Sequence, residues 1–401
     1  MRAGAATFGR AFLLAGLYFA QGLPFGIFTQ AVPVMMRQEG HSLGSIGLAN
    51  LLAAPWVLKF LWAPLVDGVP GPRRRVILPL NLAAVGLLAA LGALPPGSLG
   101  LLLVGVLLCN AVAATQDIAT DALAVELLPA SERGIGNGVQ VAGYRLGMVV
   151  GGGVLLQQFD TLGWAGTFLA AAGFVLLATI PILLVAAPPR PERRTEEKHD
   201  ALRWDRWFVG PEGRAWFGLL FFYKFGDSFG TAMVKPLFVD QGLSLADVGR
   251  LMGVFGSVAA IVGALLGGAF VSRVSLRAGL LLFGAGQVAA LLGYALLAAR
   301  GPELAAAAVV VEHLVSGMAT AALFAAMMGA CRPGHGGTDY TVQASIVVLA
   351  QGLGALASGF SAEALGYGGH FLLSALLCAV AFAWIFRVPV GQGRFALPVA
   401  S

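Results

Sequence analysis

Long apolar segments recur along the whole chain, each bounded by short polar stretches. About 20 consecutive apolar residues allow an α-helix to cross a lipid bilayer. We count twelve segments of roughly this length, at residues 10–36, 43–66, 76–94, 99–124, 136–158, 163–187, 214–240, 245–271, 276–299, 303–330, 339–361 and 367–388. Because backbone groups in lipid must be hydrogen-bonded within their own segment, these segments predict transmembrane helices rather than strands.

A short pattern of glycine, phenylalanine, serine and leucine positions occurs once in each half of the chain. The matched residues are Gly22, Phe25, Gly26, Ser42, Leu43 and Gly47 in the first half and Gly226, Phe229, Gly230, Ser244, Leu245 and Gly249 in the second. Many transporters are built from duplicated halves that rock about a site between them. We therefore predict an all-α membrane protein of two pseudo-symmetric six-helix bundles, residues 1–187 and 214–401, joined by a cytoplasmic linker at 188–213.

The composition agrees with a membrane protein. Charged residues make up 11% of the chain and hydrophobic residues 58%, whereas about 25% of the residues of an average soluble domain are charged. The 56 glycines suit faces where membrane helices approach closely, among them Gly147, Gly151, Gly263 and Gly267. The three cysteines are far apart and form no CxxC pair, so we expect no disulfide framework, metal site or cofactor.

Basic residues gather on alternate connections between the predicted spans. Cytoplasmic connections of membrane proteins carry an excess of lysine and arginine, and this bias places both termini in the cytoplasm, with a short cytoplasmic tail after the last span. The net charge of +5 arises mostly from these short connections, so it gives no reason to expect nucleic-acid binding. The partners we expect are a small-molecule substrate, protons and the lipid bilayer, and we expect a monomer.

The fourth span carries two acidic residues, Asp117 and Asp121, with Gln116 beside the first. Residues four apart share one face of a helix, and two buried carboxylates on one face disfavour each other's charge. One of them is therefore expected to hold a proton near neutral pH, which suits a proton-coupled carrier. The alternative is structural: one carboxylate pairs with Arg145 on the next span and stabilises the bundle.

The seventh span contains Tyr223, Lys224 and Asp227. The lysine and the aspartate are three residues apart, so they can pair within the helix. Such a pair is either a neutral structural feature or a functional one that loosens when a proton or an anionic substrate arrives. We favour the functional interpretation, because ionisable groups inside membranes usually serve a function.

Two further spans carry single candidates. Lys59 lies in the second span, where its ammonium can meet a carboxylate or an anionic substrate. In the tenth span, Glu312 and His313 are adjacent and are expected to face different sides of the helix. We assign Glu312 to proton coupling and His313 to packing.

The chain lacks the signatures of enzymes and of ATP-driven pumps. There is no GxxxxGK[ST] sequence and no HExxH, and no catalytic Ser/His/Asp arrangement is recognisable. We therefore expect no enzyme activity, and a carrier driven by an ion gradient or by downhill flux.

The connection between the second and third spans resembles a known family motif. Asp67 followed by Arg73, Arg74 and Arg75 is similar to the acidic–basic loop of the major facilitator superfamily. That resemblance implies the major facilitator fold of twelve helices and a gating role for Asp67, Arg73 and Arg74.

A more specific resemblance, over nearly the whole chain, is to the muropeptide permeases of the AmpG type and the related acetyl-coenzyme A transporters. The similar segments are residues 56–67, 116–122, 128–134, 143–148, 223–227 and 316–322, together with Glu312. The resemblance implies a bacterial inner-membrane importer that depends on the proton motive force and carries anhydro-muropeptides from cell-wall turnover.

The family's intramembrane carboxylates correspond to Asp117, Asp121 and Asp227. We expect contacts with the substrate from Lys59, Gln116, Tyr144, Arg145, Tyr223 and Lys224. Another cargo remains open, such as acetyl-coenzyme A, a siderophore or an exported drug, and so does a membrane sensor that transports nothing.

Overall fold

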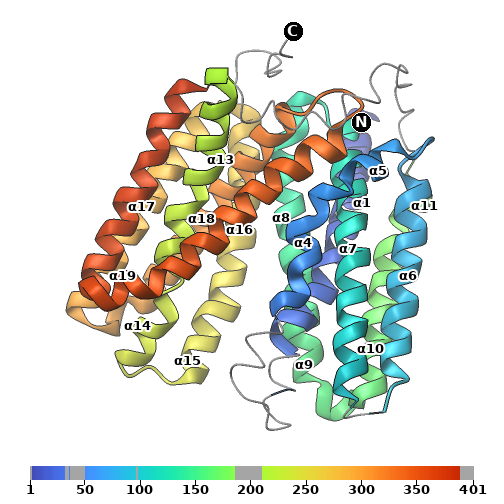
Figure 1. Ribbon diagram of the computed structural model, residues 1–401, viewed down its shortest axis with the longest axis horizontal. Coiled ribbons are helices and arrows are strands. Elements are labelled where there is room, and N and C mark those ends of the chain that lie inside the picture. The colour runs from blue at the N-terminus through green and yellow to red at the C-terminus, as the bar shows by residue number, and fades with distance from the viewer. Residues whose placement is uncertain (1, 32–35, 37–49, 96–97, 186–209, 389–401) are drawn as a thin grey trace. The chain divides into compact units, whose positions relative to one another are not determined.

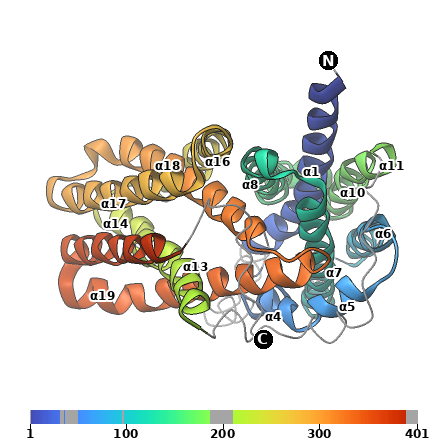
Figure 2. The same cartoon turned by 90° about the horizontal axis from the view of Figure 1, so that it is seen from above.

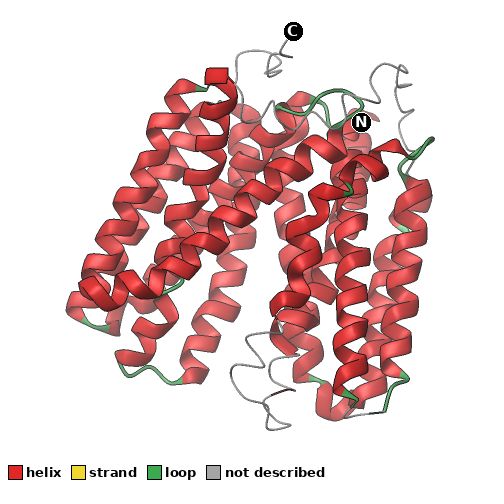
Figure 3. Ribbon diagram, viewed as in Figure 1, coloured by secondary structure: helices red, strands yellow, loops and turns green. Residues whose placement is uncertain are grey.

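The computed structural model describes the chain apart from residues 1, 32–35, 37–49, 96–97, 186–209 and 389–401. Every regular element in the described residues is helical, and none of them forms a strand (Figure 3). The α-helices are α1 (Arg2–Gly26), α4 (Ala54–Leu58), α5 (Ala63–Gly68), α6 (Arg74–Gly92), α7 (Leu99–Leu127), α8 (Arg133–Val149), α9 (Leu155–Gln157), α10 (Phe159–Thr179), α11 (Pro181–Leu184), α13 (Gly210–Thr231), α14 (Val234–Asp240), α15 (Leu245–Gly249), α16 (Gly256–Arg273), α17 (Leu276–Arg300), α18 (Ala305–Gly329) and α19 (Gly336–Arg387). The all-α prediction is confirmed.

Short turns of other helix types extend several of these helices. The π-helical turns are Ile27–Ala31, Val150–Val154 and Arg250–Phe255, and the 3₁₀ turns are Asn50–Ala53, Lys59–Leu61, Ala130–Glu132 and Pro302–Leu304. Within the described residues, nine helices are long and apolar enough to cross a membrane. One of them, α19, holds two predicted spans, because Gly366 adopts a φ of 67° and turns the chain between them.

Two predicted spans are divided into shorter helices. The second span is split between α4 and α5, each of which has a proline in its first turn, where the missing N–H does no harm. The seventh is split between α13 and α14. The beginning of the second span lies outside the described residues, as do Ser42, Leu43 and Gly47 of the repeated pattern.

The chain divides into two compact units. Unit 1 comprises Met1–Pro129, Ala142–Ala201 and Pro333–Thr341, and unit 2 comprises Ala130–Val141, Leu202–Arg332 and Val342–Ser401. Most of the predicted linker, 188–213, lies outside the described residues, so the predicted domain boundaries stay a prediction.

Unit 1 is built around α1, α6, α7 and α10. Helices α6 and α10 lie side by side, as do α1 and α7 (Figure 1). Glycines bring α1 against α8 and the π-helical turn Val150–Val154 that follows it. A Cβ at Gly147 would overlap the carbonyl oxygen of Phe19, and a Cβ at Gly151, in that turn, would overlap that of Leu23. The prediction that these glycines form a packing face is confirmed.

In unit 2, α18 packs against both α16 and α17, as Figure 2 shows from above. A Cβ at Gly263 would overlap the carbonyl oxygen of Leu314, and one at Gly267 would lie 2.5 Å from the Cα of Met318. These glycines again form a packing face, as predicted. The core nearby includes Leu291 and Phe371, each of which is fully buried.

Large apolar side chains also cover the outside of both units. Leu65, Leu356 and Phe360 are 74%, 71% and 75% exposed. Soluble monomers rarely expose wide apolar patches, so these side chains are placed to contact lipid.

Candidate functional site

A buried ion-pair network in unit 1 joins the loop before α6 to the start of α19. The guanidinium of Arg73 lies 2.7 Å from Asp67 and 2.8 Å from Glu126. Asp67 also accepts hydrogen bonds from the backbone N–H and the hydroxyl of Thr338, at 2.6 and 2.7 Å. Gly337 makes this approach possible, because a Cβ there would lie 2.7 Å from Asp67 Oδ1.

This network stabilises the charged form of Arg73. Burial works against the charge of the guanidinium, but Asp67 and Glu126 outweigh it, so the pKa of Arg73 lies above its ordinary value. Asp67 meets a helix N-terminus, where the backbone dipole favours negative charge. Arg74 is exposed, so the described contacts of the network include Arg73 and not Arg74. Sequence reasoning did not identify Glu126 or Thr338.

The two carboxylates of α7 have different partners. Lys59, on the turn after α4, forms a salt bridge with Asp117. The hydroxyl of Tyr18, on α1, donates a hydrogen bond of 2.7 Å to Asp121. Lys59 is 5% exposed and Asp121 is 1% exposed. The expectation that Lys59 can meet a carboxylate is confirmed by its pairing with Asp117. The hydrogen bond from Tyr18 to Asp121 was not predicted.

The other polar side chains of interest in unit 1 differ in burial and in hydrogen bonding. Gln116 is 2% exposed, and within the described residues neither its amide nitrogen nor its amide oxygen has a hydrogen-bond partner. Gln21, on α1, is 1% exposed, and its amide nitrogen and oxygen likewise have no hydrogen-bond partner within the described residues. Tyr144 and Arg145, both on α8, are half-buried. Buried polar groups without partners are rare, so the two glutamines are candidates for contact with a ligand.

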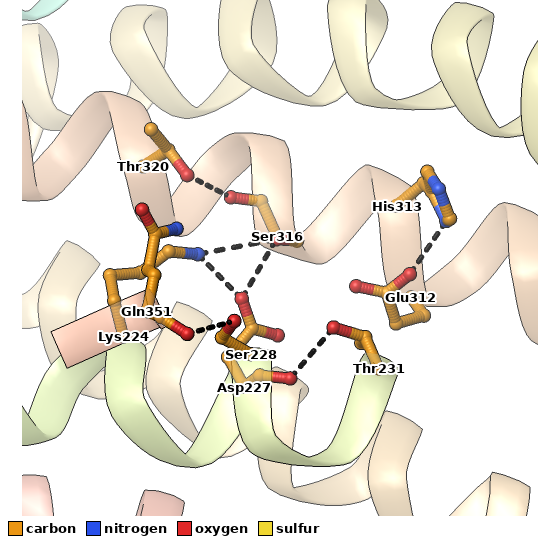
Figure 4. Close-up of polar contacts among 9 residues, drawn as sticks. All are labelled: Lys224, Asp227, Ser228, Thr231, Glu312, His313, Ser316, Thr320 and Gln351. Atoms are coloured by element: carbon orange, nitrogen blue, oxygen red, sulfur yellow. Dashed lines mark hydrogen bonds and ion pairs between the residues drawn. The ribbon is translucent and has the colours of Figure 1, made fainter. Parts of the chain in front are cut away.

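In unit 2, three side chains from α13 and α18 meet at one carboxylate oxygen. Asp227 Oδ2 lies 2.6 Å from the ammonium of Lys224 and 3.1 Å from the hydroxyl of Ser316. The ammonium also donates to that hydroxyl, at 3.2 Å. Figure 4 shows the three side chains turned toward one another. The predicted pairing of Lys224 with Asp227 is confirmed.

Asp227 has a second feature, which concerns its other carboxylate oxygen. Its other oxygen, Oδ1, is buried and has no hydrogen-bond partner in the part of the chain that the structure describes. A carboxylate oxygen that loses water without gaining a donor is destabilised as an anion. This oxygen is therefore a buried acceptor that the described contacts leave unsatisfied.

Glu312 and His313, neighbours on α18, form a pair that we did not predict. His313 Nδ1 lies 2.6 Å from Glu312 Oε2 and 3.0 Å from the carbonyl oxygen of Val309. Both neighbours are acceptors, so Nδ1 carries a hydrogen and donates it. Figure 4 shows the glutamate and the imidazole turned toward each other. Glu312 is 5% exposed, and it lies one helical turn before Ser316.

Tyr223 is placed differently from the other candidates. It is 1% exposed, and its hydroxyl donates to the carbonyl oxygen of Leu280 at 2.9 Å. Its donor is therefore already used by the backbone, and the structure does not bring it into the Lys224–Asp227–Ser316 contacts.

The ionisable side chains Lys224, Asp227, Glu312 and His313 do not carry balanced charges. Lys224 supplies one positive charge, whereas Asp227 and Glu312 supply two negative charges when both are ionised. His313 is charged only if it is protonated. With a neutral imidazole and both carboxylates ionised, these side chains together carry one net negative charge.

Comparison with known proteins identifies the family. A family model described as Major Facilitator Superfamily matches residues 14–346. The chain belongs to this superfamily. The facilitator is 34% identical over 383 residues to the anhydromuropeptide permease of Escherichia coli (strain K12), covering 91% of this chain and 77% of that protein. It is 29% identical to an uncharacterized protein of Haemophilus influenzae, covering 92% of each. The resemblance seen in the sequence is confirmed.

Solved structures support the fold of this facilitator. The Major Facilitator Superfamily transporter FucP in the outward conformation matches with a TM-score of 0.73 and 16% identity, over 96% of this chain and 100% of that one. The proton:xylose symporter XylE bound to 6-bromo-6-deoxy-D-glucose matches with a TM-score of 0.72 and 12% identity, over 98% of both chains. At these identities the likeness establishes the major facilitator fold of a multi-pass membrane protein.

Proposed function

We propose that this facilitator imports anhydromuropeptides across the bacterial inner membrane, driven by protons and working by alternating access. The observation that supports the cargo is the 34% identity to the Escherichia coli anhydromuropeptide permease over 91% of the chain. We further propose that the protein acts as a monomer without enzyme activity, with both termini in the cytoplasm. The predicted bundles, 1–187 and 214–401, would be the two moving halves.

Asp227 is the proposed carrier of the coupling proton. Protonation neutralises the carboxylate and weakens its hold on Lys224, which lies 2.6 Å away. A buried ammonium without a counter-charge is costly, so Lys224 then favours an anionic group of the cargo. The proton and the cargo therefore stabilise each other's binding. Glu312, paired with His313, is proposed to share the proton with Asp227.

Unit 1 is proposed to supply contacts with the cargo and a second proton-binding position. Asp117 and Asp121 are the proposed positions for the proton, and Lys59 exchanges Asp117 for an anionic group of the cargo. The Gln116 amide, which is unsatisfied within the described part of the chain, and the half-buried side chains of Tyr144 and Arg145 are the proposed polar contacts.

The Asp67–Arg73 network is the proposed gate. Its contacts with Thr338 at the start of α19 hold this end of unit 1 together. Release of Asp67 would free the helix N-terminus, and Arg74, which is exposed, would meet the membrane surface or solvent. Tyr223 is retained as a proposed support for Lys224, its neighbour in the chain, rather than as a cargo contact.

The proposal is tested by uptake into proteoliposomes that contain the purified facilitator. Labelled anhydromuropeptide should accumulate when the interior is made alkaline, and an uncoupler should abolish the accumulation. Uptake that equilibrates but never exceeds the outside concentration would leave the cargo assignment intact and contradict proton coupling. No flux of anhydromuropeptide under any gradient would contradict the cargo and favour another solute or a sensor.

A further inference from the structure

Three aromatic rings from three helices of unit 1 meet beside the Lys59–Asp117 pair. Phe25 on α1 lies 5.6 Å from Trp56 on α4 and 5.9 Å from Tyr144 on α8, measured between ring centroids. Trp56 and Tyr144 lie 6.3 Å apart at an interplanar angle of 78°. We call these three residues the aromatic platform. Their mutual distances are those of favourable edge-to-face and tilted ring pairs.

The local sequence explains why the platform can form. A Cβ at Gly22 would overlap the carbonyl oxygen of Tyr144, so only glycine lets α1 and α8 approach closely enough for the Phe25 and Tyr144 rings to meet. The indole N–H of Trp56 donates to Asn110 at 3.1 Å, and the Asn110 amide donates to the carbonyl oxygen of Leu52 at 2.9 Å. The orientation of the indole is therefore fixed before any ligand arrives.

The three residues of the platform are not fully buried, which separates them from an ordinary packed core. Phe25, Trp56 and Tyr144 are all half-buried. In the repeated pattern, Phe229 of unit 2 occupies the position of Phe25. Phe229 is only 4% exposed and packs against His370 at 4.7 Å. The duplicated fold thus does not require a partly exposed phenylalanine at this position, although Phe25 of unit 1 is partly exposed.

The groups around the platform indicate what it binds. The ammonium of Lys59 lies 5.5 Å from the centroid of the Trp56 ring and is paired with Asp117, so the charge beside the platform is already balanced and a ligand there needs no charge of its own. Gln21 lies one helical turn before Phe25 and has a buried amide that is unsatisfied within the described residues. Aromatic faces are negative and attract C–H groups that carry partial positive charge. A hexopyranose ring offers such C–H groups on its faces and hydroxyl or amide groups at its edge for the glutamine.

We infer that the aromatic platform binds a hexopyranose ring of the cargo, with the Gln21 amide bonding to its polar edge. This inference rests on the proposed function and deepens it: the disaccharide part of the anhydromuropeptide is held by unit 1. The carboxylates of the peptide part then bind to Lys59 and Lys224.

The test measures binding of two fragments to the purified full-length protein: the N-acetylglucosaminyl-anhydro-N-acetylmuramyl disaccharide without peptide, and the free stem peptide. In Trp56→Ala, Trp56→Phe and Phe25→Leu the Kd for the disaccharide should rise, by about fivefold or more for Trp56→Ala, given the strength of a stacked ring. The Kd for the peptide should not change. Trp164→Ala is the matched control, because the Trp164 indole also donates a hydrogen bond, to the backbone carbonyl oxygen of Leu91 at 2.8 Å, and lies outside the platform.

Tryptophan fluorescence keeps the test decisive if Trp56→Ala fails to fold. The disaccharide should change the emission of the wild type and of Trp164→Phe, and that change should be lost in Trp56→Phe. Wild-type transport of anhydromuropeptide together with unchanged disaccharide binding in Trp56→Phe and Phe25→Leu would overturn the platform and leave the proposed function standing. A wild type that binds neither the disaccharide nor the whole anhydromuropeptide would overturn both the platform and the proposed function.

Discussion

The ammonium of Lys224 lies 2.6 Å from Asp227 Oδ2, one turn further along α13, and both side chains are buried. Each charge is unfavourable in a membrane interior. Each is tolerated because the other is present, and the hydroxyl of Ser316 bonds to both. The pair is therefore sensitive to any event that removes one of the two charges.

Replacement of one partner should cost more than replacement of both. Lys224→Met leaves the Asp227 carboxylate buried without its counter-charge, and breaking a buried pair in this way costs about 3–5 kcal/mol. The double variant Lys224→Met/Asp227→Asn removes both charges and should recover much of that loss. Thermal unfolding in detergent measures the effect. A double variant no more stable than Lys224→Met would contradict the interpretation.

The hydrogen bond from Tyr18 to Asp121 should contribute measurably to stability. Tyr18→Phe removes a hydrogen bond of 2.7 Å to a buried carboxyl group, and a typical hydrogen bond within a protein contributes about 0.5–1.5 kcal/mol to stability. The matched control is Tyr294→Phe in unit 2, because the buried Tyr294 hydroxyl has no hydrogen-bond partner among the described residues. Chemical or thermal unfolding should show a loss for Tyr18→Phe and little change, or a gain, for Tyr294→Phe. Equal losses would contradict this assignment.

Glycines that allow close packing should differ sharply from glycines that face open space. Gly263→Ala places a Cβ against the carbonyl oxygen of Leu314, and overpacking of this kind typically costs about 1–3 kcal/mol. A Cβ on Gly293, in α17 of the same unit, would meet no other part of the described chain within 4 Å. Gly293→Ala should raise stability, because alanine favours a helix over glycine by about 1 kcal/mol. The reverse order in a thermal unfolding assay would refute the packing role.

The gate should depend on Asp67 and not on Arg74. Asp67→Ala removes the acceptor of two bonds from Thr338 and one partner of Arg73. Uptake should fall several-fold while the amount of protein in the membrane is preserved. Arg74→Ala changes an exposed side chain, and such changes usually alter stability by less than about 0.5 kcal/mol. Uptake that is normal in Asp67→Ala, or equally impaired in Arg74→Ala, would argue against the gate.

The sequence predicted the features of the fold that depend on local composition. Apolar length alone predicted most spans, and the spacing of Lys224 and Asp227 predicted their pair, because residues three apart in a helix are always neighbours. The break of the second span into α4 and α5 was not predicted. Its two prolines, Pro55 and Pro64, were a visible signal, but proline inside an apolar run is compatible with a kink as well as with two helices.

Contacts between distant parts of the chain were beyond sequence reasoning. Tyr18 and Asp121 are 103 residues apart, and Asp67 and Thr338 are 271 residues apart. Helical periodicity fixes which face a residue occupies but not which helix lies opposite. The Glu312–His313 pair was missed for a different reason: flexible side chains on neighbouring positions can turn toward each other although their Cβ atoms diverge.

Both Asp121 and Asp227 are buried, with exposures of 1% and 5%. In the proposed mechanism, a proton therefore reaches them through a conformation in which a path from water opens. Alternating access supplies such a conformation, and it predicts that proton exchange and cargo movement occur together rather than independently.

The most direct measurement is proton entry driven by the cargo alone. Proteoliposomes loaded with a pH-sensitive dye, with no imposed pH gradient, receive anhydromuropeptide from outside. The wild type should acidify the interior as the cargo enters, whereas Asp227→Asn should exchange labelled for unlabelled cargo without acidification; Ser228→Ala, at the next position, should behave as the wild type. Cargo entry through the wild type without acidification, or acidification that persists in Asp227→Asn, would contradict proton coupling through this carboxylate.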